Sequence, residues 1–169
     1  MKGSLLPGIA RKDPSRDTAE EKKRALEQLQ LQGASLLRNA GNTELDIVVL
    51  AQHYGLKTRL LDWTSNPLAA LWFGCADSCD GDTFVYALEA DTFHEKNVYQ
   101  KDPFVAAKIR VFQARLNNER IVAKEGWFTL HRYSKKVSQF VPLETNSEIR
   151  SHIHRLRVPA ENEEKSWAR

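Results

Sequence analysis

Residues 51–73 constrain the fold of this chain most, because they set polar side chains between two segments that are apolar on almost every side. The segment reads AQHYGLKTRLLDWTSNPLAALWF and contains His53, Arg59 and Asp62. Burying a guanidinium or a carboxylate without partners costs several kcal/mol, so such groups either satisfy one another or are held for a ligand. The sequence therefore predicts either a fixed polar network or a ligand site at this segment.

Helical patterns come first along the chain. A capping-box pattern at Thr18 and Glu21 predicts a helix that runs to about Asn39. A second helix is expected to start at Thr43, to be apolar on most sides, and to stop at Gly55. The second helix is therefore expected to lie in the core.

A loop or short strand is expected at 56–64, followed by a third helix. Ser65 or Asn66 is its expected cap, and Pro67 occupies its first turn. Because its residues are almost wholly apolar, this helix also reads as core. Asp102 and Pro103 predict a turn followed by a helical piece within 97–119. The strand patterns lie at 83–90, 120–132 and 151–159.

This order predicts an α+β fold, with N-terminal helices packed on a small antiparallel or mixed sheet from the C-terminal half. A chain of 169 residues with 41% hydrophobic content suits a single domain spanning 1–169. Within it we expect an extended segment at 1–17, mainly helices at 18–80, mainly strands at 81–160 and a tail at 161–169. The sequence has no run of 18 apolar residues and only two cysteines, so we expect a cytoplasmic protein with no membrane segment.

Charge is unevenly distributed along the chain. Residues 1–100 carry 11 Lys and Arg against 14 Asp and Glu, whereas residues 101–169 carry 14 against 8. Basic and aromatic residues alternate within 115–136, which would suit phosphate contacts and base stacking. The alternative is a solvated basic face with its aromatic residues partly in the core. The residues concerned are Arg115, Arg120, Lys124, Trp127, Phe128, Arg132, Tyr133, Lys135 and Lys136.

The central segment resembles the signature of bacterial FRG-domain proteins, in which a helix ending in QHYG is followed by TRLLDWT and an apolar helix that opens with proline. ERIVAKEGWFTLH at 119–131 resembles the second signature of that family, and KGSLLPGIAR at 2–11 resembles the segment near its start. The F-R-G tripeptide of the family is expected just upstream of residue 2 and is not in this sequence. The C-terminal tail of the family is also expected to be missing.

The resemblance implies a nucleotide-related or ADP-ribosyltransferase-like effector of toxin or phage-defence systems. The family tripeptide is similar to the strand motif through which ADP-ribosyltransferases hold NAD with an arginine. In that comparison, residues 58–64 correspond to the segment at the nicotinamide pocket, and Glu125 to the glutamate that orients the ribose. NAD is therefore the candidate cofactor, and an NAD-dependent transferase the candidate enzyme class. The alternative is a noncatalytic module that binds nucleic acid or protein.

Two interpretations of the central segment remain open at this stage. In the structural one, Arg59 and Asp62 form a partly buried pair, so that removing Asp62 costs roughly 3 to 5 kcal/mol. In the functional one, a cleft at 53–66 is closed by 120–128 and binds a nucleotide or another small molecule. Its candidate catalytic residues are His53, Asp62 and Glu125, and no metal is expected. Its candidate ligand-binding residues are Tyr54, Thr58, Arg59, Trp63, Thr64, Asn66, Arg120 and Phe128.

Overall fold

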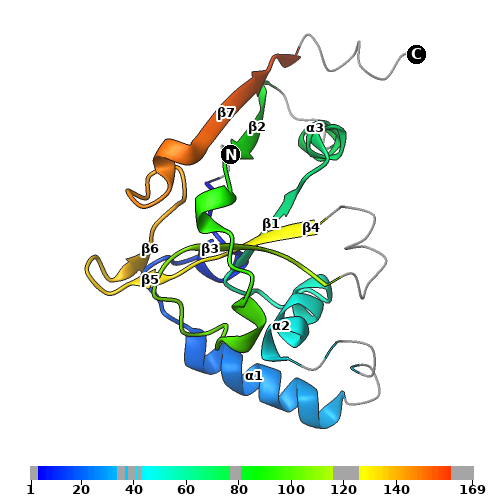
Figure 1. The fold of residues 1–169 in the computed structure, drawn as a ribbon, viewed down its shortest axis with the longest axis vertical. Coiled ribbons are helices and arrows are strands. Elements are labelled where there is room, and N and C mark those ends of the chain that lie inside the picture. Colours follow the sequence, from blue (N-terminus) through cyan, green and yellow to red (C-terminus); the bar gives the residue numbers. More distant parts are fainter. Residues whose placement is uncertain are drawn as a thin grey trace.

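Helices dominate the first half of the chain and strands the second, which confirms the predicted α+β fold (Figure 1). The computed structural model describes residues 4–33, 37, 41, 43–76, 81–115 and 126–160. The helices are α1 (Ala19–Gln32), α2 (Glu44–His53) and α3 (Pro67–Cys75). The strands are β1 (Leu60–Thr64), β2 (Thr83–Leu88), β3 (Arg110–Gln113), β4 (Gly126–Leu130), β5 (Tyr133–Ser134), β6 (Gln139–Phe140) and β7 (Ile153–Val158). Short 3-10 turns occur at Gly8–Ala10, Asp91–Phe93, Val98–Gln100 and Arg150–His152.

The strands form three antiparallel sheets instead of one. The order β1-β4-β3 makes the largest, while β2 pairs with β7 and β5 pairs with β6. Figure 1 shows β2 and β7 running away from the sheet that contains β1, with α3 beside them. Strand β1 is therefore at the edge of its sheet, and β2 has β7 as its only strand partner among the described residues.

Two apolar clusters cover the two faces of the β1-β4-β3 sheet. Leu60 and Phe128 belong to a cluster with α2, in which the rings of Phe112 and Phe128 stack at 5.6 Å. Leu61 and Trp63 pack instead against a second cluster. Side chains alternate across a strand, so neighbouring residues of β1 face opposite clusters. This alternation fixes the direction in which each residue of the central segment points.

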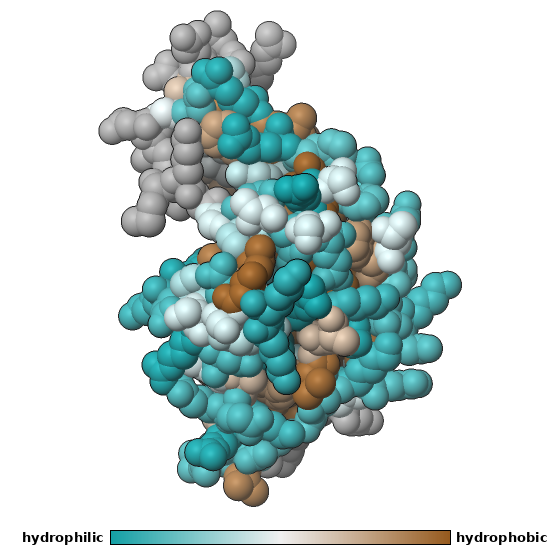
Figure 2. All heavy atoms as spheres, turned by 90° about the vertical axis from the view of Figure 1, so that its left-hand side faces the viewer, coloured by the Kyte–Doolittle hydropathy of each residue, from teal (hydrophilic) through white to brown (hydrophobic). Residues whose placement is uncertain are grey.

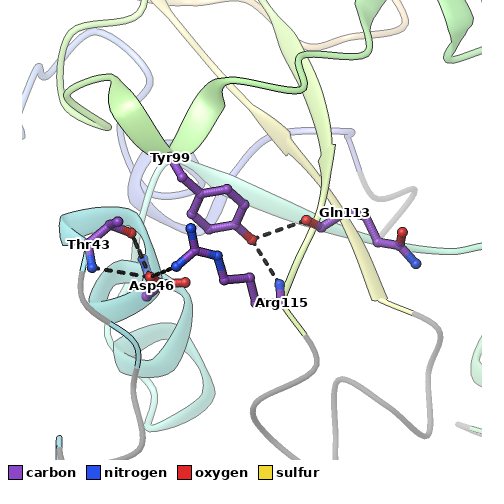
Figure 3. A network of polar contacts seen from close by, with 5 residues as sticks. All are labelled: Thr43, Asp46, Tyr99, Gln113 and Arg115. Carbon is purple, nitrogen blue, oxygen red and sulfur yellow. Dashed lines mark hydrogen bonds and ion pairs between the residues drawn. The ribbon is translucent and has the colours of Figure 1, made fainter.

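The start of α2 lies where it was expected, and a capping box between Thr43 and Asp46 holds it (Figure 3). Its hydroxyl accepts a hydrogen bond from the Asp46 N–H at 3.2 Å, and the Asp46 carboxylate accepts from the Thr43 N–H at 3.1 Å. Gly55 follows α2 with φ +92°, a left-handed conformation that glycine adopts without strain. Both predicted ends of this helix are confirmed.

The helix α1 differs from its prediction at both ends. Thr18 makes no side-chain cap, because Asp17 Oδ1 accepts from the Ala19 N–H at 3.2 Å and Glu21 pairs with Arg16 at 2.5 Å. The helix stops at Gln32, where the N–H of Gly33 bonds the Leu29 carbonyl, so the expected continuation to Asn39 is wrong. At the start of α1 the Asp17 carboxylate replaces Thr18 as the acceptor, and at its end Gly33 stops the helix although the apolar pattern continues.

The helix α3 begins as predicted but is not buried. Asn66 Oδ1 accepts from the Leu68 and Ala69 N–H groups at 3.0 and 3.2 Å, and Pro67 is the first helical residue. No residue of α3 is buried, and the exposed fractions of Leu68 and Trp72 are 74% and 49%. The expectation of a core helix is therefore wrong, because α3 packs mainly against β1 and β2 and its opposite side faces out.

The helical piece expected within 97–119 is also wrong where the structure describes it. Residues Arg110–Gln113 form β3, whose Val111 and Phe112 are buried against β4. A strand of four residues has too few positions for its alternation of apolar and polar residues to be recognised from sequence alone. Strands β2 and β7 lie where strands were expected, and β4 lies within 120–132 but ends at Leu130. None of the described helices is long and apolar enough to cross a membrane.

Candidate functional site

Arg59 is buried and held by protein groups other than Asp62. Its side chain is 4% exposed, its Nη1 donates to the Phe104 carbonyl at 2.7 Å, and its Nη2 lies 3.5 Å from Asp17 Oδ1. Burial lowers the Arg59 pKa, an effect that Asp17 and Asp102 oppose. The predicted pair between Arg59 and Asp62 is not formed. Arg59 instead ties the segment before α1 to the segment before β1.

Asp62 belongs to a short chain of polar contacts at the end of α2. Gln52 Nε2 donates to Asp62 Oδ1 at 2.9 Å, and Gln52 Oε1 accepts from the Thr58 hydroxyl. The same hydroxyl accepts from the Leu60 N–H at 3.0 Å. Thr58 is buried, whereas Asp62 is exposed. Thr58 therefore fixes the turn before β1, and the carboxylate of Asp62 stays accessible.

A second polar chain crosses the other face of β1 and includes a residue that sequence reasoning missed. Trp63 Nε1 donates to Thr129 Oγ1 at 3.1 Å, and that oxygen lies 3.0 Å from His131 Nε2. His131 is 1% exposed, and burial, with the Arg59 charge as a smaller cause, lowers its pKa from 6.5 to about 3. The alternation of FTLH could have placed Thr129 and His131 on one strand face, since residues two apart share a face.

The remaining candidate residues do not form one cleft. The His53 ring meets Phe128 edge-on at 6.5 Å, and Phe128 is a core residue that is 2% exposed. Tyr54 follows α2 and is 77% exposed. Thr64 Oγ1 accepts from the N–H of the helix cap Asn66 at 3.0 Å. Arg120 and Glu125 lie outside the described residues.

A cavity of about 620 Å³ lies where β1, α3 and β2 meet, and we call it the β1–β2 cavity. It takes in three predicted site residues, Asp62, Trp63 and Thr64, but not His53, Tyr54 or Arg59. Arg11 lines it from the N-terminal segment, with its Nε donating to the Leu6 carbonyl at 3.2 Å. The full lining is Ser4, Leu5, Arg11, Leu61, Asp62, Trp63, Thr64, Ala70, Phe73, Gly74, Phe84, Val85 and Tyr86.

The cavity runs along the outer edges of β1 and β2. The His131 N–H donates to the Arg59 carbonyl, so the backbone groups of Arg59 and of every second residue after it face β4. The backbone N–H and C=O of Asp62 lie between these positions and therefore point away from β4. The Glu89 N–H bonds the His152 carbonyl, and the same rule turns the backbone groups of Tyr86 away from β7. Both Asp62 and Tyr86 line the cavity. Two strand edges therefore border one space.

The FRG domain family matches residues 2–83. Residues 2–83 therefore belong to the FRG domain family. The match confirms the family resemblance for residues 2–83, and the second signature at 119–131 lies outside it. The match ends at the first residue of β2, so it includes the β1 and α3 walls of the cavity. No curated protein and no solved structure matches the chain.

The described basic and aromatic residues of 115–136 divide between two places. Arg132, Tyr133, Lys135 and Lys136 line one groove, whereas Arg115, Trp127 and Phe128 do not line it. Figure 3 shows Arg115 turned toward α2, where its Nη1 lies 3.0 Å from Asp46 Oδ2 and its guanidinium lies over the Tyr99 ring at 4.2 Å. Trp127 meets His94, and Phe128 is in the core. Arg115, Trp127 and Phe128 are therefore engaged within the protein, and a nucleic-acid or protein partner for 115–136 stays a prediction.

Two histidines of β7 and its preceding turn contact one carboxylate. His152 and His154 lie 3.4 and 2.9 Å from the two oxygens of Glu89, and these contacts hold the Glu89 pKa below its usual value. Among the residues described by the structure, no group of three or more His, Cys, Asp or Glu side chains is arranged to hold a metal ion.

Proposed function

We propose that this FRG-domain chain is a protein-binding module that accepts an extended peptide strand in the β1–β2 cavity. The observation that supports the proposal is that the outward backbone groups of Asp62 and of Tyr86 border the same space. Unpaired edge groups are a template for strand addition, in which main-chain hydrogen bonds supply much of the affinity. A peptide between the two edges would join the β1-β4-β3 and β2-β7 sheets.

The lining suits the two faces of such a strand. Ala70, Phe73 and Gly74 of α3 line the cavity together with apolar residues such as Leu5. Apolar peptide side chains would pack there, while the exposed Asp62 carboxylate favours a basic side chain on the peptide. The expected ligand is therefore a short extended segment with alternating apolar residues and at least one lysine or arginine.

The test uses a blocked eight-residue peptide of alternating valine and threonine with a lysine at each end. We expect the peptide to quench or shift the Trp63 fluorescence with a Kd on the order of 10 to 100 µM, or about −7 to −5.5 kcal/mol. A peptide of the same sequence with N-methylated backbone amides keeps the side chains but loses hydrogen-bond donors. It should bind at least about tenfold more weakly, a difference of about 1.4 kcal/mol.

A matched pair of protein variants places the peptide. Ala70→Leu puts extra volume into the cavity and should abolish binding, whereas Ala69→Leu is next to it on α3 but does not line the cavity. Binding that is equal for both variants, or equal for the two peptides, would contradict strand addition between β1 and β2.

A nucleotide such as NAD is a second candidate for the same cavity. Its volume of about 620 Å³ lies within the range of small-molecule sites, and Arg11 provides a cation that can meet a phosphate. Under this alternative, NAD binds in calorimetry and Arg11→Ala removes the heat, while the exposed neighbour Lys12→Ala does not. If both ligands bind, they should compete, because they occupy the same cavity. If the peptide gives heat on titration and NAD does not, the result favours the peptide strand over the nucleotide.

A further inference from the structure

A second groove, distant in sequence from the β1–β2 cavity, lies beside the β5–β6 hairpin. It encloses about 730 Å³, and we call it the hairpin groove. Figure 2 views the molecule from the side on which Figure 1 places β5 and β6, and apolar patches lie there among hydrophilic side chains. The groove is lined by Val105, Ala106, Ala107, Arg132, Tyr133, Ser134, Lys135, Lys136, Val137, Val141, Thr145, Asn146 and Ser147.

The charge of the hairpin groove has one sign. Arg132, Lys135 and Lys136 line it, and no Asp or Glu does. Arg132 is fixed by the Ala107 carbonyl at 3.1 Å and by Glu148, which lies 3.3 Å from its Nε. The two lysines at the hairpin turn are exposed, and no ion pair joins them to the described carboxylates. An anion in the groove would therefore meet two uncompensated cations and one pre-positioned guanidinium.

The groove also offers polar groups at fixed positions. Asn146 is 8% exposed, and its Oδ1 accepts from the Glu148 N–H at 3.0 Å. That bond fixes the amide, whose Nδ2 group has no hydrogen-bond acceptor among the described residues. Ser134 and Ser147 line the same groove, whereas the Thr145 hydroxyl donates to the Pro142 carbonyl at 3.2 Å. Such donors suit the oxygen atoms of a phosphate.

The other part of the lining is apolar. Val105 and Val137 are 68% and 51% exposed, and Val141, Ala106 and Ala107 line the groove with them. Tyr133 does not offer a free stacking face, because its ring meets Phe140 edge-on and its hydroxyl donates to the Ser15 carbonyl. This lack of a stacking platform disfavours single-stranded nucleic acid, which binds mainly through base stacking.

We propose that the hairpin groove binds a phosphate-bearing small molecule of nucleotide size. The phosphates contact Lys135, Lys136 and the Asn146 amide, and the less polar part of the ligand covers Val105 and Val137. A volume of 730 Å³ lies within the range of small-molecule sites, which combine apolar walls with a few placed polar groups. This site is independent of the strand proposed for the β1–β2 cavity.

The test is calorimetric titration of the full chain with ADP, adenosine and inorganic pyrophosphate. We expect ADP to bind, adenosine to bind at least about tenfold more weakly, and ADP affinity to fall as salt rises, because phosphate contacts are screened. The double variant Lys135→Ala/Lys136→Ala should weaken ADP at least tenfold. Lys12→Ala/Lys96→Ala removes the same charge elsewhere and should change the affinity by less than twofold.

Three further results decide the proposal. Val137→Ser should weaken ADP more than pyrophosphate, and Arg11→Ala should leave ADP binding intact, because Arg11 lines the other cavity. The absence of heat with millimolar ADP would overturn the proposal, as would pyrophosphate binding as tightly as ADP. Tighter binding of an oligothymidine than of ADP would also overturn it in favour of nucleic acid.

Discussion

Arg59→Ala is expected to lower the free energy of unfolding by about 2 to 4 kcal/mol. The substitution removes a side chain that is 4% exposed, and it leaves the Phe104 carbonyl without its donor. It also removes the contact of the guanidinium with the Phe140 ring at 5.8 Å. Urea unfolding followed by tryptophan fluorescence measures the effect.

Asp62→Ala is the informative comparison for Arg59. Asp62 is exposed and bonds only Gln52 among the described groups, so its loss should cost less than about 1 kcal/mol. Arg16→Ala serves as a control for arginine removal, because its side chain is 63% exposed and pairs with Glu21 at the surface. A larger loss for Asp62→Ala than for Arg59→Ala would restore the pair predicted from sequence and contradict the structural account.

Acidification is expected to destabilise the fold through His131. Its pKa in the folded state is about 3, against 6.5 without burial, so the unfolded chain takes up a proton at this residue that the folded chain does not. Stability gained from the neutral ring is therefore complete above pH 6.5 and is lost as pH falls toward 3. Between pH 7 and 5 the loss should be about 2 kcal/mol.

The measurement is the free energy of unfolding in urea at several pH values between 7 and 5. The carboxyl groups with lowered pKa, Asp13, Glu89 and Glu95, stay ionised in this window, so His131 is separated from them. Stability that is constant or rises on acidification would contradict a neutral buried His131.

Local features of the fold could be predicted from sequence because their partners lie within a few residues. The start of α2 at Thr43, the stop at Gly55 and the Asn66 cap of α3 are of this kind. The partner of Arg59 could not be predicted, because Asp17 lies 42 positions away and Asp62 lies only three away. Sequence spacing favoured the wrong carboxylate.

The candidate site was predicted only in part, because sequence can group residues that are neighbours along the chain but not residues that are distant along it. Asp62, Trp63 and Thr64 line the β1–β2 cavity, as the emphasis on the central segment suggested. Arg11 and Tyr86 reach it only through the tertiary arrangement of the N-terminal segment and β2. The apolar pattern of α3 indicated a helix that packs against other elements. It did not indicate how many elements cover the helix, so its exposed side could not be predicted.

Hydrogen exchange of the Asp62 and Tyr86 backbone amides, followed by NMR with and without the valine–threonine peptide, tests the strand proposal most directly. Both amides lie on outer strand edges, so strand addition in the β1–β2 cavity should slow exchange at one or both. The Leu61 amide already faces β4 and should change little. A peptide that binds while the exchange of Asp62 and of Tyr86 stays the same would contradict the account.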